Sequence, residues 1–375
     1  MFTKRTKAAL IRGIITKRTP IYVQYAVTKN CNLRCRMCAS SISRSQEREL
    51  SLPEIIKLAD VLDRLHAGVI LLTGGEPFLR ADIAEIIGIF SGKNFTVRLQ
   101  TNGVLATEEK IRAAYSAGME EVTVSLDSLI PETSDAITGQ QGSWHKIIDS
   151  LARFSQILPT RNSVIGINTV VCRQNIREVT SIIKFATEIG FYSSLIPVHT
   201  ASSDSDDFII RKHAPGFSFQ KEDFEMIDEV YREIINMKRQ GYNIYNSYKF
   251  LRNSPVFLKT GRVAWHCDSP SLYFAISPSG KFLPCVDIKT SVSMIDGDFC
   301  NLYNSKSFQS SIQEKVKKCS GCFYACWPEM TFLCRDPLVL AERIFLGMKA
   351  KFKKRDPVSY EQCLRIIDKL RKGPG

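Results

Sequence analysis

Short apolar segments alternate with amphipathic segments along most of the chain, and this alternation limits the folds available to it. From residue 20 onward, apolar runs with strand character are followed by stretches with helical periodicity. The expected strands lie near residues 21–27, 68–73, 95–100, 120–126, 164–172 and 191–198, and the expected helices near residues 52–66, 81–91, 107–117, 143–156, 176–189 and 221–239. Strands joined through helices form a parallel sheet with right-handed crossovers, so this order predicts an α/β protein.

Three cysteines, Cys31, Cys35 and Cys38, directly follow the first expected strand with C-x3-C-x2-C spacing. Three neighbouring thiols cannot pair among themselves without leaving one over, and no fourth Cys or His lies nearby, as a zinc site usually requires. Their number suits a cubane iron–sulfur cluster, whose irons are held by Cys thiolates. Three protein ligands leave one iron open to another molecule.

Polar and glycine-rich motifs follow the next expected strands. The strand near 68–73 leads into Gly74, Gly75, Glu76 and Pro77. Paired glycines let backbone approach a ligand closely, and a carboxylate is suited to face an ammonium group. Two further strands end in polar residues, at 99–103 and 122–129. Parallel sheets place their sites at these carboxyl ends, so the motifs are expected to meet at one edge.

The cysteine spacing, the Gly-Gly-Glu-Pro motif and the polar strand ends, in this order, resemble the radical S-adenosylmethionine (SAM) superfamily. The resemblance implies a (β/α)6 partial TIM-type barrel with a 4Fe–4S cluster on Cys31, Cys35 and Cys38, which are thus both metal ligands and catalytic residues. SAM would occupy the open iron and be cleaved reductively to a 5′-deoxyadenosyl radical that takes a hydrogen atom from the substrate. An electron donor such as flavodoxin or ferredoxin would supply the electron.

The resemblance also implies which residues contact SAM. The motif at residues 74–77 would hold the amino group of the SAM methionine, and the backbone at Met37 would meet the adenine. Polar residues at strand ends would complete the site, although the sequence fits a purely structural role for them equally well. The expected cofactor-binding residues are Met37, Gly74, Gly75, Glu76, Pro77, Thr101, Ser125 and Asn168.

A second group of cysteines lies beyond residue 240, at Cys267, Cys285, Cys319, Cys322, Cys326 and Cys334. A turn at Ser279-Gly280 predicts a hairpin that brings the first two together. The spacing resembles SPASM and twitch domains, extensions of radical SAM enzymes that carry auxiliary clusters, although a full SPASM domain has seven cysteines. The resemblance implies one auxiliary 4Fe–4S cluster for electron transfer or substrate anchoring. Its expected ligands are Cys267, Cys285, Cys319 and Cys322, with Cys326 as an alternative to one of the last two. A zinc site on the same thiols is the competing interpretation.

The net charge of +13 is concentrated at the two ends of the chain. Residues 1–18 hold six Lys or Arg and no acid, and residues 335–375 hold eleven against five acids. Apolar residues recur at helical spacing within both ends. Basic amphipathic segments bind anionic membrane surfaces or nucleic acid, but two solvated helices that cover the barrel explain the pattern equally well.

The composition indicates a cytoplasmic protein, either free or associated with a membrane surface. No apolar run approaches the ~18–20 residues of a membrane helix, and the N-terminus is a poor match to a signal peptide. Twelve cysteines without a regular pairing pattern favour metal binding over disulfides. The expected divisions are a basic segment at 1–18, a radical SAM core at 19–240, an iron–sulfur domain at 241–334 and a basic helical tail at 335–375.

The substrate stays open at this point: a peptide, a sugar or another small molecule would all suit such an enzyme. Two other functions are also compatible with the sequence. One is a nucleic-acid-binding or tRNA-modifying protein whose C-terminal cysteines hold zinc. The other is a membrane-surface enzyme that acts on a lipid-linked substrate. The neutral central body and the lack of stacking aromatics near the basic ends make nucleic acid the weaker candidate.

Overall fold

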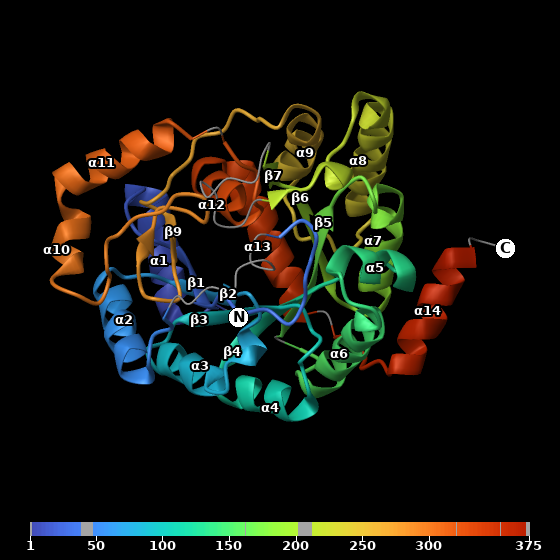
Figure 1. Ribbon diagram of the computed structural model, residues 1–375, viewed down its shortest axis with the longest axis horizontal. Helices are drawn as coiled ribbons and strands as arrows, with labels where there is room; N and C mark the ends of the chain where they lie inside the picture. The colour runs from blue at the N-terminus through green and yellow to red at the C-terminus, as the bar shows by residue number, and fades with distance from the viewer. Residues whose placement is uncertain are drawn as a thin grey trace.

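The computed structural model describes residues 2–38, 48–161, 163–201, 212–319, 321–352 and 354–372. Its main sheet has eight strands in the order β10-β9-β1-β2-β3-β4-β5-β6, and neighbours from β1 to β6 are all parallel. The sheet curves into a partial barrel with helices on its outer face (Figure 1). The prediction of an α/β partial barrel is therefore confirmed.

The strands are β1 (Tyr22–Thr28), β2 (Val69–Gly74), β3 (Thr96–Thr101), β4 (Met119–Ser125), β5 (Val164–Val171), β6 (Tyr192–Pro197), β7 (Thr200–Ala201), β8 (Lys212–His213), β9 (Tyr273–Ile276) and β10 (Phe282–Leu283). The helices of the barrel are α2 (Leu52–Arg64), α3 (Ile83–Gly92), α4 (Glu108–Ser116), α5 (Pro131–Thr138), α6 (Ser143–Ile157), α7 (Val179–Glu188) and α8 (Phe224–Arg239). The others are α1 (Lys4–Thr16), α9 (Tyr248–Thr260), α10 (Phe299–Asn304), α11 (Lys306–Lys317), α12 (Cys326–Arg335), α13 (Pro337–Phe352) and α14 (Tyr360–Lys372).

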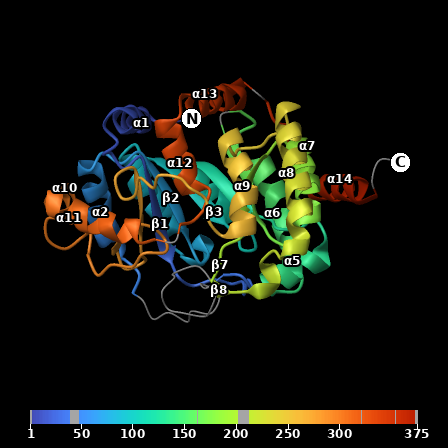
Figure 2. The same cartoon turned by 90° about the horizontal axis from the view of Figure 1, so that it is seen from above.

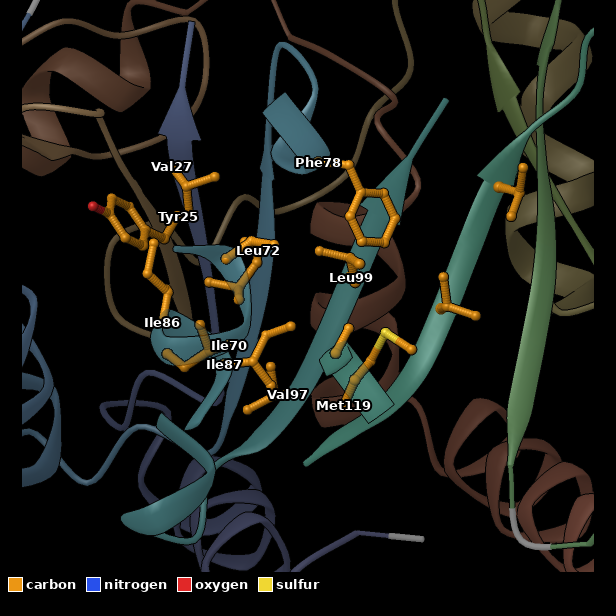
Figure 3. Packing of buried hydrophobic residues seen from close by; sticks show 14 of the residues in the cluster. Tyr25, Val27, Ile70, Leu72, Phe78, Ile86, Ile87, Val97, Leu99 and Met119 are labelled. Atoms are coloured by element: carbon orange, nitrogen blue, oxygen red, sulfur yellow. The ribbon is translucent and has the colours of Figure 1, made fainter. Parts of the chain in front are cut away.

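Alternation along each strand separates an apolar outer face from a more polar inner face. Outward side chains of β1, β2 and β3 pack with apolar residues of α3 in one continuous core. Figure 3 shows this packing around Tyr25, Leu72, Leu99 and Ile86. Because side chains of a strand point alternately to opposite faces, the residues between them point into the barrel. The apolar outer layer thus leaves the inner face free for a binding site.

The cysteine-rich region is continuous with the barrel rather than a separate layer. Strand β9 pairs in parallel with β1, with Tyr22 opposite Tyr273 and Tyr25 opposite Ile276. Strand β10 then pairs antiparallel with β9 and forms the edge of the sheet. The expected boundary at residue 240 therefore does not coincide with a break in the sheet.

Helix α1 covers the barrel at the amino ends of the strands. Thr6 Oγ1 donates to Gly68 O at 2.8 Å, directly before β2. Gly13 allows close approach to Ile21, since a Cβ at this position would lie 2.3 Å from the Ile21 side chain. Figure 2 shows α1 and α13 along one edge of the molecule and β7 and β8 at the opposite edge.

The last helix, α14, returns to the outer layer beside α6 and α7 (Figure 1). Its connection is fixed by buried Arg355, whose guanidinium donates to Ser155 Oγ at 2.8 Å and to Leu158 O at 3.0 Å. These groups lie at the carboxyl end of α6, where a cation is favoured by the unpaired carbonyls. No helix in the described ranges has both the length and the hydropathy needed to cross a membrane.

Candidate functional site

The loop at residues 31–38, called the cluster loop here, follows the carboxyl end of β1 and docks on the end of α5. Arg34 N donates to Thr138 O at 3.0 Å. Gly139 ends α5 with a φ of 68°, and a Cβ there would lie 2.6 Å from Arg34 O. Glycine is therefore required both for the left-handed turn and for the close approach of the cluster loop.

The two glycines after β2 fix the other side of the cluster loop. Gly75 N donates to Thr28 O at 2.8 Å, and a Cβ on Gly75 would lie 2.0 Å from Asn30 O. Gly74 has a φ of 144°, and a Cβ there would lie 2.2 Å from Thr28 O. The sequence suggested that these glycines allow approach of a ligand. Both glycines also lie against the backbone that leads into Cys31, and their expected contact with SAM stays a prediction.

Glu76 is fully buried, and its carboxylate is used inside the protein. One oxygen accepts from Phe78 N at 3.0 Å and from Thr101 Oγ1 at 2.7 Å, and the other accepts from Asn102 N at 2.7 Å. Burial raises the pKa of Glu76, while the donated hydrogen bonds oppose this shift. Glu76 and Thr101 thereby join the loop after β2 to the loop after β3. This is the structural role that the sequence left open for Thr101.

Asn102 is a site residue that the sequence analysis did not select, although its neighbour Thr101 was named. Its side-chain nitrogen Nδ2 donates to Asn32 Oδ1 at 2.9 Å and lies 3.7 Å from Cys31 Sγ. Leu33 N also donates to Cys31 Sγ, at 3.4 Å. Hydrogen bonds to cysteine sulfur tune iron–sulfur clusters, so Cys31 has the surroundings of a ligand.

The electrostatics of the cluster loop disfavour thiolates unless a cation is present. Burial is the largest cause that raises the pKa of Cys31 and of Cys35, and the charge of Cys38 raises both further. Burial also raises the pKa of Asp127 to about 7, and a charge on Asp127 raises that of Cys35. Metal ions invert this effect, because a coordinated thiol loses its proton. Three thiols in one anchored loop thus fit a cationic iron–sulfur cluster.

The other expected SAM contacts occupy two kinds of position. Ser125 and Asn168 pair across β4 and β5 at the carboxyl edge, and Asn168 lines the cavity inside the barrel. Met37 lies in the cluster loop and packs against a small buried apolar group that includes Ile137. Pro77 is buried and starts a short 3-10 turn. Ser125, Asn168 and Met37 are therefore placed near the cysteines' edge of the barrel.

Four C-terminal thiols come together from distant parts of the chain; they are called the auxiliary group here and comprise Cys267, Cys285, Cys319 and Cys322. Burial raises the pKa of Cys267 and of Cys285, and the charge of Cys319 raises both further. The pKa of Cys322 is also raised by burial first and then by Cys285 and Cys267. Each of these thiols thus lies within electrostatic range of others in the group.

The sulfur atoms of the auxiliary group also accept hydrogen bonds. The donors are Tyr273 Oη to Cys267 at 3.5 Å, Asp287 N to Cys285 at 3.4 Å, and Gly321 N to Cys319 at 3.4 Å. Two of the donors are the N–H groups two residues after the cysteine, as with Leu33 and Cys31. By contrast, the Cys300 thiol donates to Val61 O at 3.7 Å, as an ordinary buried thiol does.

Cys326 has different surroundings from the auxiliary group. Its sulfur lies 3.5 Å from Tyr22 Oη and lines the cavity inside the barrel. Burial is the main cause that raises its pKa, with Tyr22 and Arg98 among the nearby groups and no other cysteine among them. Cys334 is buried in the apolar cluster that Cys326 packs against, which also contains Tyr22 and Trp327. The structure thus brings four of the expected auxiliary ligands together and places Cys326 at the barrel.

A cavity of about 120 Å³ lies inside the barrel. Its upper wall carries Gln100, Thr123 and Asn168 from the inner faces of the strands. Two ion pairs that are mostly shielded from solvent form its floor: Arg98 with Glu121 at 2.6 Å and Arg343 with Glu329 at 2.9 Å. The Tyr192 hydroxyl, also in the wall, is buried and has no hydrogen-bond partner among the described residues. The cavity therefore offers polar contacts to a ligand inside the partial barrel.

A partial barrel with three thiols beside its carboxyl edge defines the class of radical SAM proteins, and comparison with known proteins agrees. The model of the protein family described as "Radical SAM superfamily" matches residues 25–186 of the chain. A probable GTP 3′,8-cyclase of Methanothermobacter thermautotrophicus is 30% identical over 277 residues, covering 72% of this chain and 85% of the relative. The chain belongs to the radical SAM superfamily. A 4Fe–4S cluster and SAM are accordingly its cofactors.

Other relatives are matched over a shorter part of their length. An AdoMet-dependent heme synthase of Methanosarcina barkeri is 29% identical over 197 residues, which cover 52% of this chain and 55% of the relative. The chain thus spans about half the length of that relative.

Solved structures share the fold across the cysteine-rich region as well. The structure of native anSMEcpe with bound AdoMet has a TM-score of 0.60 at 16% identity and covers 94% of this chain and 97% of its own. The structure of Streptococcus suis SuiB bound to precursor peptide SuiA has a TM-score of 0.61 at 14% identity and covers 82% and 70%, respectively. At this identity the likeness concerns the fold.

Proposed function

We propose that the chain reductively cleaves SAM at a cluster held by Cys31, Cys35 and Cys38 and removes a hydrogen atom from a substrate in the barrel. The observation that carries this proposal is the anchored cluster loop, with Asn102 beside Cys31 at the carboxyl edge of the strands. When bound, the cluster supplies one electron and SAM supplies the group that abstracts the hydrogen atom. The chain's own residues orient these groups and exclude water from the barrel.

The cavity inside the barrel is the proposed substrate site. Its small volume suits one short polar group, such as a peptide side chain or part of a small molecule. The ion pairs at its floor are internally neutral, so they favour a polar group without requiring a net charge. Because SuiB was solved with a precursor peptide, we infer that a peptide is the first substrate class to test. A sugar or another small molecule is the alternative.

We further propose that the auxiliary group holds a second 4Fe–4S cluster. Four thiolates leave no iron open, which favours electron transfer over SAM binding. Two observations support this proposal. The charges of these thiols affect one another's pKa, and three of the sulfur atoms accept hydrogen bonds. Sequence reasoning offered zinc as the competing occupant, and the metal content decides between them.

We infer a cytoplasmic location, because an open iron site and twelve cysteines need a reducing compartment. The electron donor is proposed to be an acidic flavodoxin or ferredoxin. Arg34 and Arg36 are exposed in the cluster loop, beside the cysteines that would receive the electron. Such a basic patch increases the association rate of an acidic carrier.

The test is anaerobic reconstitution followed by measurement of iron, sulfide, zinc and 5′-deoxyadenosine after addition of SAM and reductant. We expect about eight irons per chain and SAM cleavage, as two 4Fe–4S clusters require. Cys31→Ala should lose cleavage, whereas Cys300→Ala, which changes a buried thiol outside both groups, should retain it. Full cleavage by Cys31→Ala would contradict the proposed catalytic site. About four irons plus zinc, with cleavage, would restrict the proposal to the cluster loop.

A further inference from the structure

We propose that the outer face of α1 and α13 docks the protein on an anionic membrane surface. This surface is called the docking face here, and its large apolar side chains are Ile11, Ile15, Leu338, Ile344, Phe345 and Met348, each between 50% and 81% exposed. They are six of the eleven large apolar side chains that are exposed in the described ranges. The other five are scattered singly over other elements. A concentration of this kind marks an interaction surface.

Helix α13 is attached to the barrel by two ion pairs and by buried Val339, and it presents most of its other large apolar side chains outward. On the inner side, Arg343 binds Glu329 at 2.9 Å, and Glu342 binds Lys238 at 2.8 Å. The exposed apolar residues recur at positions 338, 344, 345 and 348, which is the spacing of one helical face. The only acid within α13 is already paired beneath this face.

Helix α1 adds positive charge beside exposed isoleucines. Its inner side is fixed by Thr6, Ala9 and Gly13, which are buried. Its outer side carries exposed Lys4, Lys7 and Arg12 among the apolar residues, and residues 1–18 contain no acid. Residues 335–355 hold seven Lys or Arg in the sequence, of which Arg335, Arg343 and Arg355 pair within the protein and the other four, all lysines, follow Met348. An apolar surface with surrounding cations is complementary to the headgroups and acyl chains of an anionic bilayer.

The two helices act from the same end of the molecule. Figure 2 shows α1 and α13 at one edge, away from β7 and β8. A cavity of about 300 Å³ lies where Phe2 and Lys7 approach Ile344 and Met348, and its lining continues to Arg98 and Tyr192 in the barrel. Docking by this end would leave the cluster loop, at the opposite ends of the strands, free to meet an electron carrier.

A bilayer explains both properties of the docking face, whereas other partners explain only one. Nucleic acid would use the cations, but it gains little from isoleucine, leucine and methionine side chains. A second copy of the chain would cover the apolar residues, but it would bring two positively charged surfaces together. The charge and the exposed apolar residues together therefore favour anionic lipid.

The test is flotation of the full-length protein with vesicles of phosphatidylcholine alone or of equal parts phosphatidylcholine and phosphatidylglycerol. We expect binding to the anionic vesicles only, with weaker binding at high salt. The double variant Ile11→Ser/Ile15→Ser should bind at least about tenfold more weakly, the factor that corresponds to about 1.4 kcal/mol of lost apolar burial. Arg12→Gln should bind about fivefold more weakly, as expected for one cation near an anionic surface.

Helix α2 provides matched controls, because Ile56 and Lys57 are an exposed Ile-basic pair on another surface. Ile56→Ser and Lys57→Gln should bind vesicles as the wild type does, and thermal melts should show that all variants fold. Absence of binding at low salt would overturn the proposal, as would equal weakening by the α2 variants. Sensitivity to Arg12→Gln without sensitivity to the isoleucine changes would indicate a polyanion such as nucleic acid instead. A dimer in solution that Phe345→Ser dissociates would identify a second copy as the occupant.

Discussion

The two cysteine groups of this protein differ in how the chain assembles them. The cluster loop supplies its three thiols within eight residues. It bonds to Thr138, and the residues that lead into it, Thr28 and Asn30, lie against Gly75. The auxiliary group collects four thiols from positions that span residues 267–322. Cysteines of both groups accept an N–H from the residue two positions later. The groups thus share the local hydrogen bond but differ in the number of ligands and in their anchoring.

This difference separates two kinds of site. A short loop with three thiols leaves one coordination position free and depends on neighbouring loops for its shape. A set of four thiols completes its coordination, and its shape depends on the packing of the surrounding chain. Reactivity is therefore expected at the first group, and electron transfer or anchoring at the second. Each prediction below tests one part of this contrast.

Loss of a ligand should have the largest effect, and its consequence should depend on the group. Cys35→Ala and Cys285→Ala should each lose about four irons, because each removes a ligand of one 4Fe–4S cluster. Only Cys35→Ala should abolish formation of 5′-deoxyadenosine from SAM. Iron analysis and product chromatography measure the two outcomes. Loss of cleavage in Cys285→Ala, with the cluster-loop iron retained, would show that the two groups do not function separately.

Anchoring of the cluster loop should be sensitive to one methyl group. In Gly75→Ala the added Cβ would lie 2.0 Å from Asn30 O, so backbone must move. We expect a loss of about 1–3 kcal/mol in the free energy of unfolding, together with reduced SAM cleavage. Gly88→Ala in α3 is the control, since nothing lies within 4 Å of its Cβ and alanine favours a helix. Denaturation and activity assays on both variants would detect the difference; equal behaviour would contradict the anchoring role.

Stability of the iron-free protein should depend on pH through Asp127, beside the cluster loop. Its pKa is raised to about 7 by burial, from an ordinary value near 3.8. The folded state therefore holds a proton that the unfolded state has lost, and stability falls as pH rises from about 4 to 7. Asp127→Asn removes this dependence, so its advantage over the wild type should grow by about 1–3 kcal/mol across that range. Urea melts at both ends of the range measure this change, and a constant difference would contradict the assignment.

The smallest effects are expected from the hydrogen bonds to sulfur. Asn102→Ala removes a donor near Cys31, and Tyr273→Phe removes the hydroxyl that donates to Cys267. Fewer hydrogen bonds to sulfur lower the reduction potential of a cluster, so each variant should lower the potential of its own cluster only. Redox titration followed by electron paramagnetic resonance would resolve the two signals. A shift of both potentials by either variant would contradict independent sites.

The barrel was predictable from the sequence because each strand is a short apolar run with helical periodicity after it. Observed strands such as β2 (Val69–Gly74) and β5 (Val164–Val171) agree with expectation to within a residue or two. After residue 240 the hairpin around Ser279-Gly280 was predicted, and the antiparallel pair β9 and β10 confirms it. Helix α9 was not predicted, because Pro255 weakens its helical signal. Pairing of β9 with β1 joins segments about 250 residues apart, and no local pattern indicates it.

Some features of the candidate site were likewise predictable from the sequence, and others were not. The spacing and the family resemblance singled out the cluster loop and the four cysteines of the auxiliary group as expected ligands, and their roles stay predictions. It did not show that Glu76 and the glycines serve the protein's own backbone, because backbone and ligand contacts require the same residue types. Asn102 could have been found from the polar end of its strand, but its contact with Cys31 depends on the curvature of the sheet. Cys326 is separated from its sequence neighbour Cys322 by the start of α12, which turns it toward the barrel.

The burial of the auxiliary thiols has a consequence for how the protein matures in the cell. Cys285 and Cys322 are each 8% exposed, and residues packed with them come from β1, β9 and α12. We therefore expect the proposed auxiliary cluster to be loaded more readily before these elements pack around Cys285 and Cys322, as metal binding couples to folding. The cysteines of the cluster loop are half-buried, so we expect that a cluster can be inserted there after the protein has folded. We therefore expect oxygen damage at the open iron to be repaired in the folded protein more readily than loss of the proposed auxiliary cluster.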